Sequence, residues 1–323
     1  MSDASLGGEA DRRRANSSRI VAFLLMAFIW GAGWLPTKLA MEVLPPIFFA
    51  CLRFTMAALG FLVFARLRGF SLRVERPGRV LAASLLITTA CYALVFWGLA
   101  QAPSGLAAVV NLGLMPIFLI GIGAAYGQEP ITPLRVAAII FGLAGLALLF
   151  SGRFGASGEG AKAVFGLAAV ALGTLAYAWG TVISRPIVRA TPPVVLAFWQ
   201  SCLGTLGLIP ISLAVEGWDP GRFAALSDPR VLRGLAVMVG GGSLIALPIF
   251  LMLLRDWGAF RAGLYAFVSP VIAVLIGYAF AAERIDMAEA VGMAVTLAAT
   301  ALALGKPGRT ATWERWAPRG TRR

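Results

Sequence analysis

The hydrophobic positions of this chain fall into long runs that short polar or proline-containing segments separate. The hydrocarbon core of a bilayer is ~30 Å thick and takes ~20 helical residues. The runs approach that length without alternating polar and apolar residues, so they predict helices rather than the strands of a membrane barrel. We expect ten membrane-spanning helices, at residues 20–40, 47–65, 80–99, 105–126, 134–150, 164–183, 194–215, 231–254, 259–282 and 288–304.

The polar and proline positions also repeat, which predicts two related halves. Trp30-Gly31 in the first expected helix returns as Trp179-Gly180 in the sixth. Pro45-Pro46 likewise returns as Pro192-Pro193. The expected organisation is a cytoplasmic N-terminal tail (1–19), a first repeat of five helices (20–150), an external linker (151–163), a second repeat of five helices (164–304) and a basic cytoplasmic C-terminal tail (305–323).

An odd number of helices in each repeat would place the two repeats in opposite orientations across the membrane. The predicted fold class is therefore an all-α integral membrane protein, with ten transmembrane helices as two inverted five-helix repeats. That arrangement is typical of secondary transporters, in which substrate sites lie near the bilayer midplane at the repeat interface and face each side in turn.

Charge patterning predicts how the protein is oriented. Most arginines and lysines lie in the termini and in alternate connections, notably the arginine-rich segment 66–79. These segments share one side of the expected topology, and cytoplasmic loops carry the excess of basic residues in membrane proteins. We expect a multi-pass protein of the cell inner (plasma) membrane with both termini in the cytoplasm.

Composition supports a membrane protein and narrows the classes of function. The chain is 59% hydrophobic and 13% charged, whereas about a quarter of the residues of a soluble domain are charged. Its net charge of +13 gathers at the termini and in short loops, so we do not expect nucleic-acid binding. Because the chain has no histidine, and its three cysteines lie inside apolar runs, we expect no metal, cofactor or catalytic site. A membrane-embedded enzyme and a lipid-handling protein are the alternative functions.

Several short motifs occur in a characteristic order. They are Trp30-Gly31 with Lys38, Leu44-Pro45-Pro46, Leu52-Arg53-Phe54, Met115-Pro116, Gly127-Gln128-Glu129, Ser269-Pro270 and Ala282-Glu283-Arg284. In order and spacing, the chain resembles the EamA-type domains of the drug/metabolite transporter superfamily over about residues 20–305. The second repeat departs from the first, with Gln200 in place of Arg53 and no lysine at the Lys38 position. The resemblance implies ten helices in two inverted repeats, a central cavity and movement of small organic metabolites, often outward.

Polar and aromatic residues inside the expected helices are the candidates for substrate binding. Asn111 and Tyr265 stand at matching positions before Pro116 and Pro270, and a proline inside a helix frees carbonyls that neighbours or cavity water must satisfy. A helix bent around a solvated cavity and a packing kink both explain this pattern. The full candidate set is Trp30, Trp34, Lys38, Tyr92, Asn111, Tyr177, Trp179, Ser243 and Tyr265. The expected partners are membrane lipid and a small-molecule solute such as an amino acid or a related amphipathic metabolite.

Charged residues and glycines leave alternatives open. Lys38 and Arg53 either extend to the outer membrane interface, or form a cationic outer vestibule for carboxylate-bearing solutes, or supply a gate charge that pairs with Glu42. Glu129 and Glu283 either stabilise the start of the next helix or bind a coupling proton. The glycines before Ser243 either allow close helix packing or form a hinge.

Overall fold

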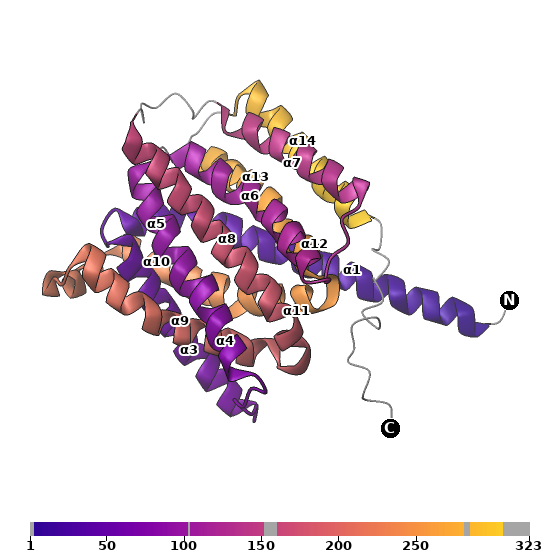
Figure 1. Ribbon diagram of the computed structural model, residues 1–323, viewed down its shortest axis with the longest axis horizontal. Helices are drawn as coiled ribbons and strands as arrows, with labels where there is room; N and C mark the ends of the chain where they lie inside the picture. The colour runs from indigo at the N-terminus through magenta and orange to yellow at the C-terminus, as the bar shows by residue number, and fades with distance from the viewer. Residues whose placement is uncertain (1–2, 103, 152–159, 281–284, 306–323) are drawn as a thin grey trace.

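The computed structural model describes residues 3–102, 104–151, 160–280 and 285–305, all of them in helices or short connections (Figure 1). No strand occurs within these ranges, which confirms the all-α prediction. In the same ranges, 9 helices are long and apolar enough to cross a membrane. The expected fifth span, 134–150, corresponds to an apolar helix of 17 residues, which is shorter than those nine.

The first half contains five helical segments in chain order. The first span joins α1 (Asp3–Ala32) to α2 (Trp34–Met41), and the second is α3 (Pro46–Leu67). The third is continuous through α4 (Pro77–Ser84), the π-helical η1 (Leu85–Ala90) and α5 (Cys91–Gln101). The last two are α6 (Ser104–Ala125) and α7 (Pro133–Leu149). Helix α1 begins well before residue 20, so part of the expected N-terminal tail is helical.

The second half follows the same plan. It begins with α8 (Ala161–Ala190) and α9 (Pro193–Glu216), followed by a short 3₁₀ segment, η3 (Pro220–Ser227). The next span combines α10 (Pro229–Leu235), the π-helical η4 (Ala236–Ile245) and α11 (Ala246–Trp257). It is followed by α12 (Ala259–Gly263) with α13 (Tyr265–Phe280), and by α14 (Met287–Gly305). A π-helical segment therefore interrupts the third span of each half.

Proline and glycine mark the ends of many of these helices. A proline occupies the first turn of α3, α4, α7, α9 and α10. Backbone N–H groups in the first turn have no acceptor within the helix, so a residue without an N–H costs no hydrogen bond there. Gly217 follows α9 with φ 72°, and Gly258 follows α11 with φ 90°. Residues other than glycine rarely adopt such positive φ values, so these two glycines end their helices sharply.

Helices from the two halves pack against each other throughout the bundle. Helix α3 pairs with α9 and α7 pairs with α14, while α8 contacts both α5 and α6, and α1 contacts both α13 and α11. The α7–α14 pair lies at one edge of the bundle (Figure 1). A Cβ atom at Gly145 would lie 2.3 Å from Thr296 Oγ1, and one at Gly292 would lie 2.5 Å from the Leu149 nitrogen. These glycines therefore allow the close approach of α7 and α14.

Hydroxyl groups of the π-helical segment η1 form hydrogen bonds with α9. Thr88 Oγ1 donates to the Gln200 carbonyl at 3.2 Å, and Thr89 Oγ1 donates to the Gly204 carbonyl at 2.8 Å. A Cβ at Gly204 would lie 2.2 Å from Thr88 Cβ. The glycine thus lets α9 approach η1 closely enough for these bonds to form.

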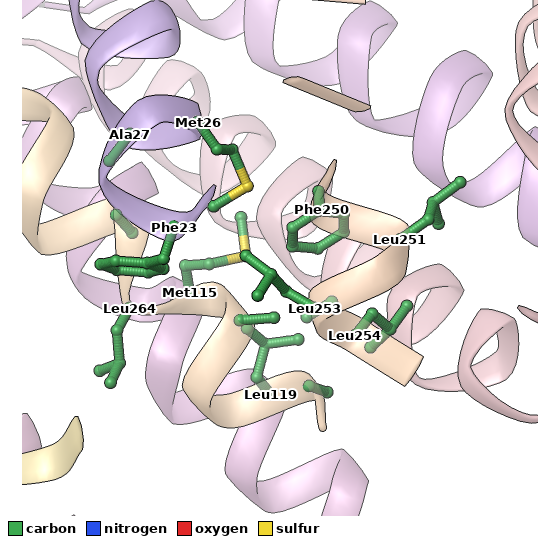
Figure 2. Close-up of a cluster of buried hydrophobic side chains, with 14 of the residues drawn as sticks. Phe23, Met26, Ala27, Met115, Leu119, Phe250, Leu251, Leu253, Leu254 and Leu264 are labelled. Atoms are coloured by element: carbon green, nitrogen blue, oxygen red, sulfur yellow. The ribbon is translucent and has the colours of Figure 1, made fainter. Parts of the chain in front are cut away.

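A densely packed apolar core lies between α1, α6 and α11. Figure 2 shows its side chains, and among them Phe23, Met26, Leu119, Leu253 and Leu254 are fully buried. Phe250 extends from α11 at the margin of this core and also contacts the aromatic side chains described next. The core therefore supports one side of the candidate site.

Candidate functional site

Four aromatic side chains from four spans meet next to the packed core. The Trp30 ring of α1 lies 4.5 Å from the Tyr265 ring of α13 and 5.6 Å from the Phe250 ring of α11, measured between centroids. Tyr177 of α8 lies 6.3 Å from Phe250, and Phe250 in turn lies 5.8 Å from Tyr265. We call Trp30, Tyr177, Phe250 and Tyr265 the aromatic cluster. Phe250 is buried, whereas the side chains of Trp30, Tyr177 and Tyr265 remain partly accessible.

The π-helical segment η4 connects the aromatic cluster to a polar group. Trp30 Nε1 donates a hydrogen bond of 3.0 Å to the Gly242 carbonyl. The next residue, Ser243, is fully buried, and its Oγ accepts a 3.2 Å hydrogen bond from Arg53 Nε. Adjacent residues of η4 therefore fix a ring of the aromatic cluster and a guanidinium group side by side.

Arg53 lies inside the protein rather than on its surface. It stands seven residues after the start of α3, a depth of about 10 Å at 1.5 Å per residue, and its residue is 8% exposed. Arg53 Nη1 donates to the Tyr92 hydroxyl at 3.3 Å, and its Cζ lies 5.7 Å from the centre of the Tyr92 ring. The interfacial alternative for Arg53 does not fit this burial. The position of Arg53 inside an apolar run was the signal that the sequence offered. The sequence did not indicate which residues Arg53 would contact.

Five of the nine candidate residues thus come together at this place. They are Trp30, Tyr92, Tyr177, Ser243 and Tyr265. Asn111 lies beside them: its Oδ1 accepts a 2.8 Å hydrogen bond from Thr174 Oγ1, one turn of α8 before Tyr177. Gly242, the last of the glycines before Ser243, also borders this group, and it lies in the π-helical segment η4 rather than in a regular helix.

Three candidates lie elsewhere, and the helix geometry explains why. Trp179 is 44% exposed and donates to the Tyr126 hydroxyl, because residues two apart on a helix, such as Tyr177 and Trp179, point to different sides. Trp34 is 40% exposed. Trp34 follows the break between α1 and α2, so it does not continue the face of α1 that carries Trp30. The helix breaks here because Pro36 has no N–H to donate to the carbonyl of Ala32. Lys38 is exposed on α2.

A second polar group, around Glu129, lies at the other end of α8 and α11. The Glu129 carboxylate is 2% exposed, and its two oxygens pair with Arg135 Nη1 at 2.8 Å and with Arg185 Nη1 at 3.3 Å. Arg185 Nη1 also donates to the Gln128 carbonyl at 2.7 Å. Glu129 therefore binds the α6–α7 connection to the end of α8. Its expected counterpart Glu283 lies outside the described residues.

Gly258 completes this ion-pair group. A Cβ at Gly258 would lie 2.2 Å from Glu129 Oε1 and 2.9 Å from Arg185 Nη2. Three residues later, the Arg261 guanidinium lies 5.0 Å from the centre of the Trp257 ring and donates to the Leu304 carbonyl. The turn between α11 and α12 is thus packed directly on the ion pairs, which joins parts of both halves at this end of the bundle.

An apolar groove on the surface is separate from both polar groups. It runs between the start of α3, the end of α9 and η3, and its lining includes Phe48, Ile209, Leu213, Trp218 and Phe223. Exposed apolar side chains of this kind are expected where helices face lipid. The groove is therefore not the site that the sequence pattern predicts.

These features define a class of protein. Apolar helices of membrane-spanning length surround a place where aromatic and polar side chains from both halves meet, which is the architecture of a multi-pass membrane transporter. The model of the EamA-like transporter family matches residues 17–151 and 164–305. The chain belongs to this family of drug/metabolite transporters, as its motifs predicted, and is a transporter rather than an enzyme.

Known relatives are similar over most of their length. The chain is 27% identical over 288 residues to the "Uncharacterized inner membrane transporter YedA" of Escherichia coli (strain K12), which covers 88% of this chain and 90% of YedA. It is 24% identical over 281 residues to the "Uncharacterized transporter YvbV" of Bacillus subtilis (strain 168). A solved crystal structure shares the fold with a TM-score of 0.72 at 23% identity, over 89% of this chain and 96% of the other.

Proposed function

We propose that this transporter moves small amphipathic metabolites, such as amino acids and their relatives, by alternating access at the aromatic cluster. The observation that carries the proposal is the meeting of Trp30, Tyr177 and Tyr265, which come from spans of both halves and retain accessible surface. Aromatic rings with polar tips can hold the apolar body of a solute and also donate hydrogen bonds to it.

The proposed mechanism uses two inverted repeats, 20–150 and 164–304, joined by an external linker. The packing of the helices supports this symmetry. Helix α1 packs on α13 as α8 packs on α6, and the pairs α3–α9 and α7–α14 each join corresponding helices of the two halves. Exchanging the halves maps these contacts onto one another, and both third spans contain a π-helical segment. An odd number of spans per repeat would then orient the repeats oppositely.

We further propose that the protein lies in the inner membrane with both ends in the cytoplasm. The name of the relative YedA includes the inner membrane, and the distribution of basic residues supports the orientation. Among the described side chains, the aromatic cluster and the group around Arg53 contain neither a carboxylate nor an imidazole. We therefore propose an exporter or facilitator driven by the gradient of the solute itself, without a coupling proton bound at this site.

Transport by the purified protein in proteoliposomes tests the proposal. Uptake of a radiolabelled amino-acid panel is compared for the wild type, Tyr177→Leu and Tyr265→Leu. We expect each leucine variant to lower uptake of transported solutes about three- to tenfold, since aromatic pairs contribute ~0.5–1.5 kcal/mol beyond their buried area. Phe165→Leu is the matched control, because Phe165 lies on the same helix as Tyr177 but is exposed on the outer face.

Two results contradict the proposal. One is a wild type that moves no member of the panel above empty vesicles. The other is equal uptake by wild type, both tyrosine variants and the Phe165→Leu control, which would place the solute path elsewhere.

A further inference from the structure

Arg53 is a buried cation whose charge no described residue neutralises. Arg53 is 8% exposed, and it forms no ion pair with any acidic side chain in the part of the chain that the structure describes. Its partners among the described residues are two hydroxyl groups and two aromatic rings. An arginine stays protonated under all ordinary conditions, and an uncompensated buried charge is strongly unfavourable.

The guanidinium group also has unused donors. It carries five N–H donors, of which Nε uses one on Ser243 and Nη1 uses one on Tyr92. The remaining donors, including both on Nη2, have no acceptor among the described residues. Nη2 lies 3.6 Å from the position that a Cβ on Gly242 would take. The free donors are therefore next to Gly242, whose carbonyl holds the Trp30 ring.

We propose that Arg53 binds the carboxylate of a solute that carries one carboxylate group and whose apolar body packs on Trp30 and Tyr265. This inference rests on the proposed transport function and specifies its substrate class. Paired N–H groups of a guanidinium match the two oxygens of a carboxylate. Ser243 and Tyr92 hold the guanidinium in place. The guanidinium bonds to Ser243 and the Trp30 ring bonds to the neighbouring residue of η4, so the charge lies beside the aromatic surface.

The charge balance at Arg53 selects a solute with one carboxylate group. One carboxylate neutralises Arg53, whereas a dianion such as a phosphate ester would leave a net negative charge buried between the helices. A primary amine without a carboxylate would meet a like charge at this place. The site therefore favours monocarboxylates over neutral amides, and neutral amides over amines.

The second half of the protein does not duplicate this charge. At the position that matches Arg53 stands Gln200, which is buried and donates through Nε2 to Ser184 Oγ at 2.9 Å. The glutamine is neutral, so the two halves together present one cationic anchor. We accordingly expect one anion bound per protein.

Equilibrium dialysis of the full-length purified protein with three probes of one shape tests the site. The probes are radiolabelled 3-phenylpropionate, 3-phenylpropanamide and 3-phenylpropylamine, which share a body and differ in charge. The wild type is expected to bind the carboxylate about tenfold or more tightly than the amide, in line with the strength of hydrogen bonds to charged groups. Arg53→Gln is expected to abolish that difference, and Arg53→Lys to retain only part of it.

Arg66→Gln is the matched control, since it removes one positive charge from an exposed position on the same helix. If Arg53→Gln does not fold, Ser243→Ala and Tyr92→Phe replace it, because each removes a hydroxyl partner of Arg53 and should lower the carboxylate preference severalfold. Equal binding of carboxylate and amide by the wild type overturns the proposal. So do preference for the amine, absence of carboxylate binding, and a carboxylate preference that survives Arg53→Gln.

Transport of the neutral amide separates this inference from the proposed function. If the amide moves as fast as the carboxylate in wild-type proteoliposomes, transport stands and the anion site is wrong. If none of the three probes and no amino acid moves, the transport proposal itself fails, and carboxylate binding alone then decides whether Arg53 is an anion site.

Discussion

Two buried charges of this protein have neighbours of different kinds. Glu129 pairs with two arginines, so its charge is satisfied within the protein. Arg53 has hydroxyl groups and rings as neighbours, and its charge is left for an external group to neutralise. Ion pairs between buried partners are usually structural, whereas an unpaired ionisable residue among membrane-spanning helices is a candidate for a functional site. The partners of these two residues thus distinguish the ion-pair group around Glu129 from the proposed binding group around Arg53.

A half-buried acid at the start of α10 gives a pH prediction at the same scale. The side chain and the backbone N–H of Arg230 donate to Asp228 at the start of α10, and these bonds lower the pKa of Asp228 to about 2. A depressed carboxyl pKa adds stability that is present above the ordinary value near 4 and is lost as the pH falls through about 2. Carbon-13 NMR of labelled aspartate carboxyls should show one midpoint near 2 that disappears in Asp228→Asn. A midpoint near 4 for this residue would contradict the bonding described.

The turn between α11 and α12 is an element whose shape depends on one glycine. Gly258 has φ 90° and ψ 172°, a region that is essentially limited to glycine. Its missing side chain also leaves room for Glu129 and Arg185. The backbone conformation and the ion pairs therefore act together at this position.

A pair of substitutions separates the two contributions. Gly217 has nearly the same backbone angles, φ 72° and ψ 179°, but nothing lies within 4 Å of a Cβ built there. Gly217→Ala should lower the free energy of unfolding by about 1–3 kcal/mol from strain alone. Gly258→Ala should lower it by about 3 kcal/mol more, because it also displaces a buried ion pair. Reversible unfolding in mixed micelles measures both, and equal effects would show that the ion pairs tolerate the methyl group.

The boundaries of several elements could be predicted from the sequence, and others could not. The expected spans 47–65 and 194–215 agree closely with α3 and α9, because prolines mark their starts. Helix α8 extends to Ala190, beyond the expected end at 183, and continues through Pro186. The π-helical segments depend on contacts with other spans, such as the hydroxyl bonds to α9, and hydropathy does not contain that information.

The candidate site was predictable in its residue types but not in its membership. Tyrosine and tryptophan inside apolar runs identified Trp30, Tyr177 and Tyr265. The same rule also selected Trp179, because it does not specify which side of the helix faces inward. Arg53 reaches partners 39 and 190 positions away, and only the folded bundle brings them together.

At the scale of the whole molecule, the proposed topology has a direct test. Glu75→Cys, in the segment after α3, should react with a membrane-impermeant maleimide only in opened cells. Ala224→Cys, in η3, should react in intact cells. The wild type is the control, since Cys51, Cys91 and Cys202 lie within spans. Labelling of both positions from one side would exclude the proposed arrangement of the repeats.

The difference between Arg53 and Gln200 has a consequence for the resting state of the protein. A transporter with two identical inverted halves would have mirror-related inward-facing and outward-facing forms of equal free energy, and would populate both equally. Here one half carries a buried charge where the other carries a neutral amide. If the protein alternates between two such forms as proposed, they hydrate that charge to different extents. The empty protein is then biased toward one of them, and anion occupancy shifts the ratio.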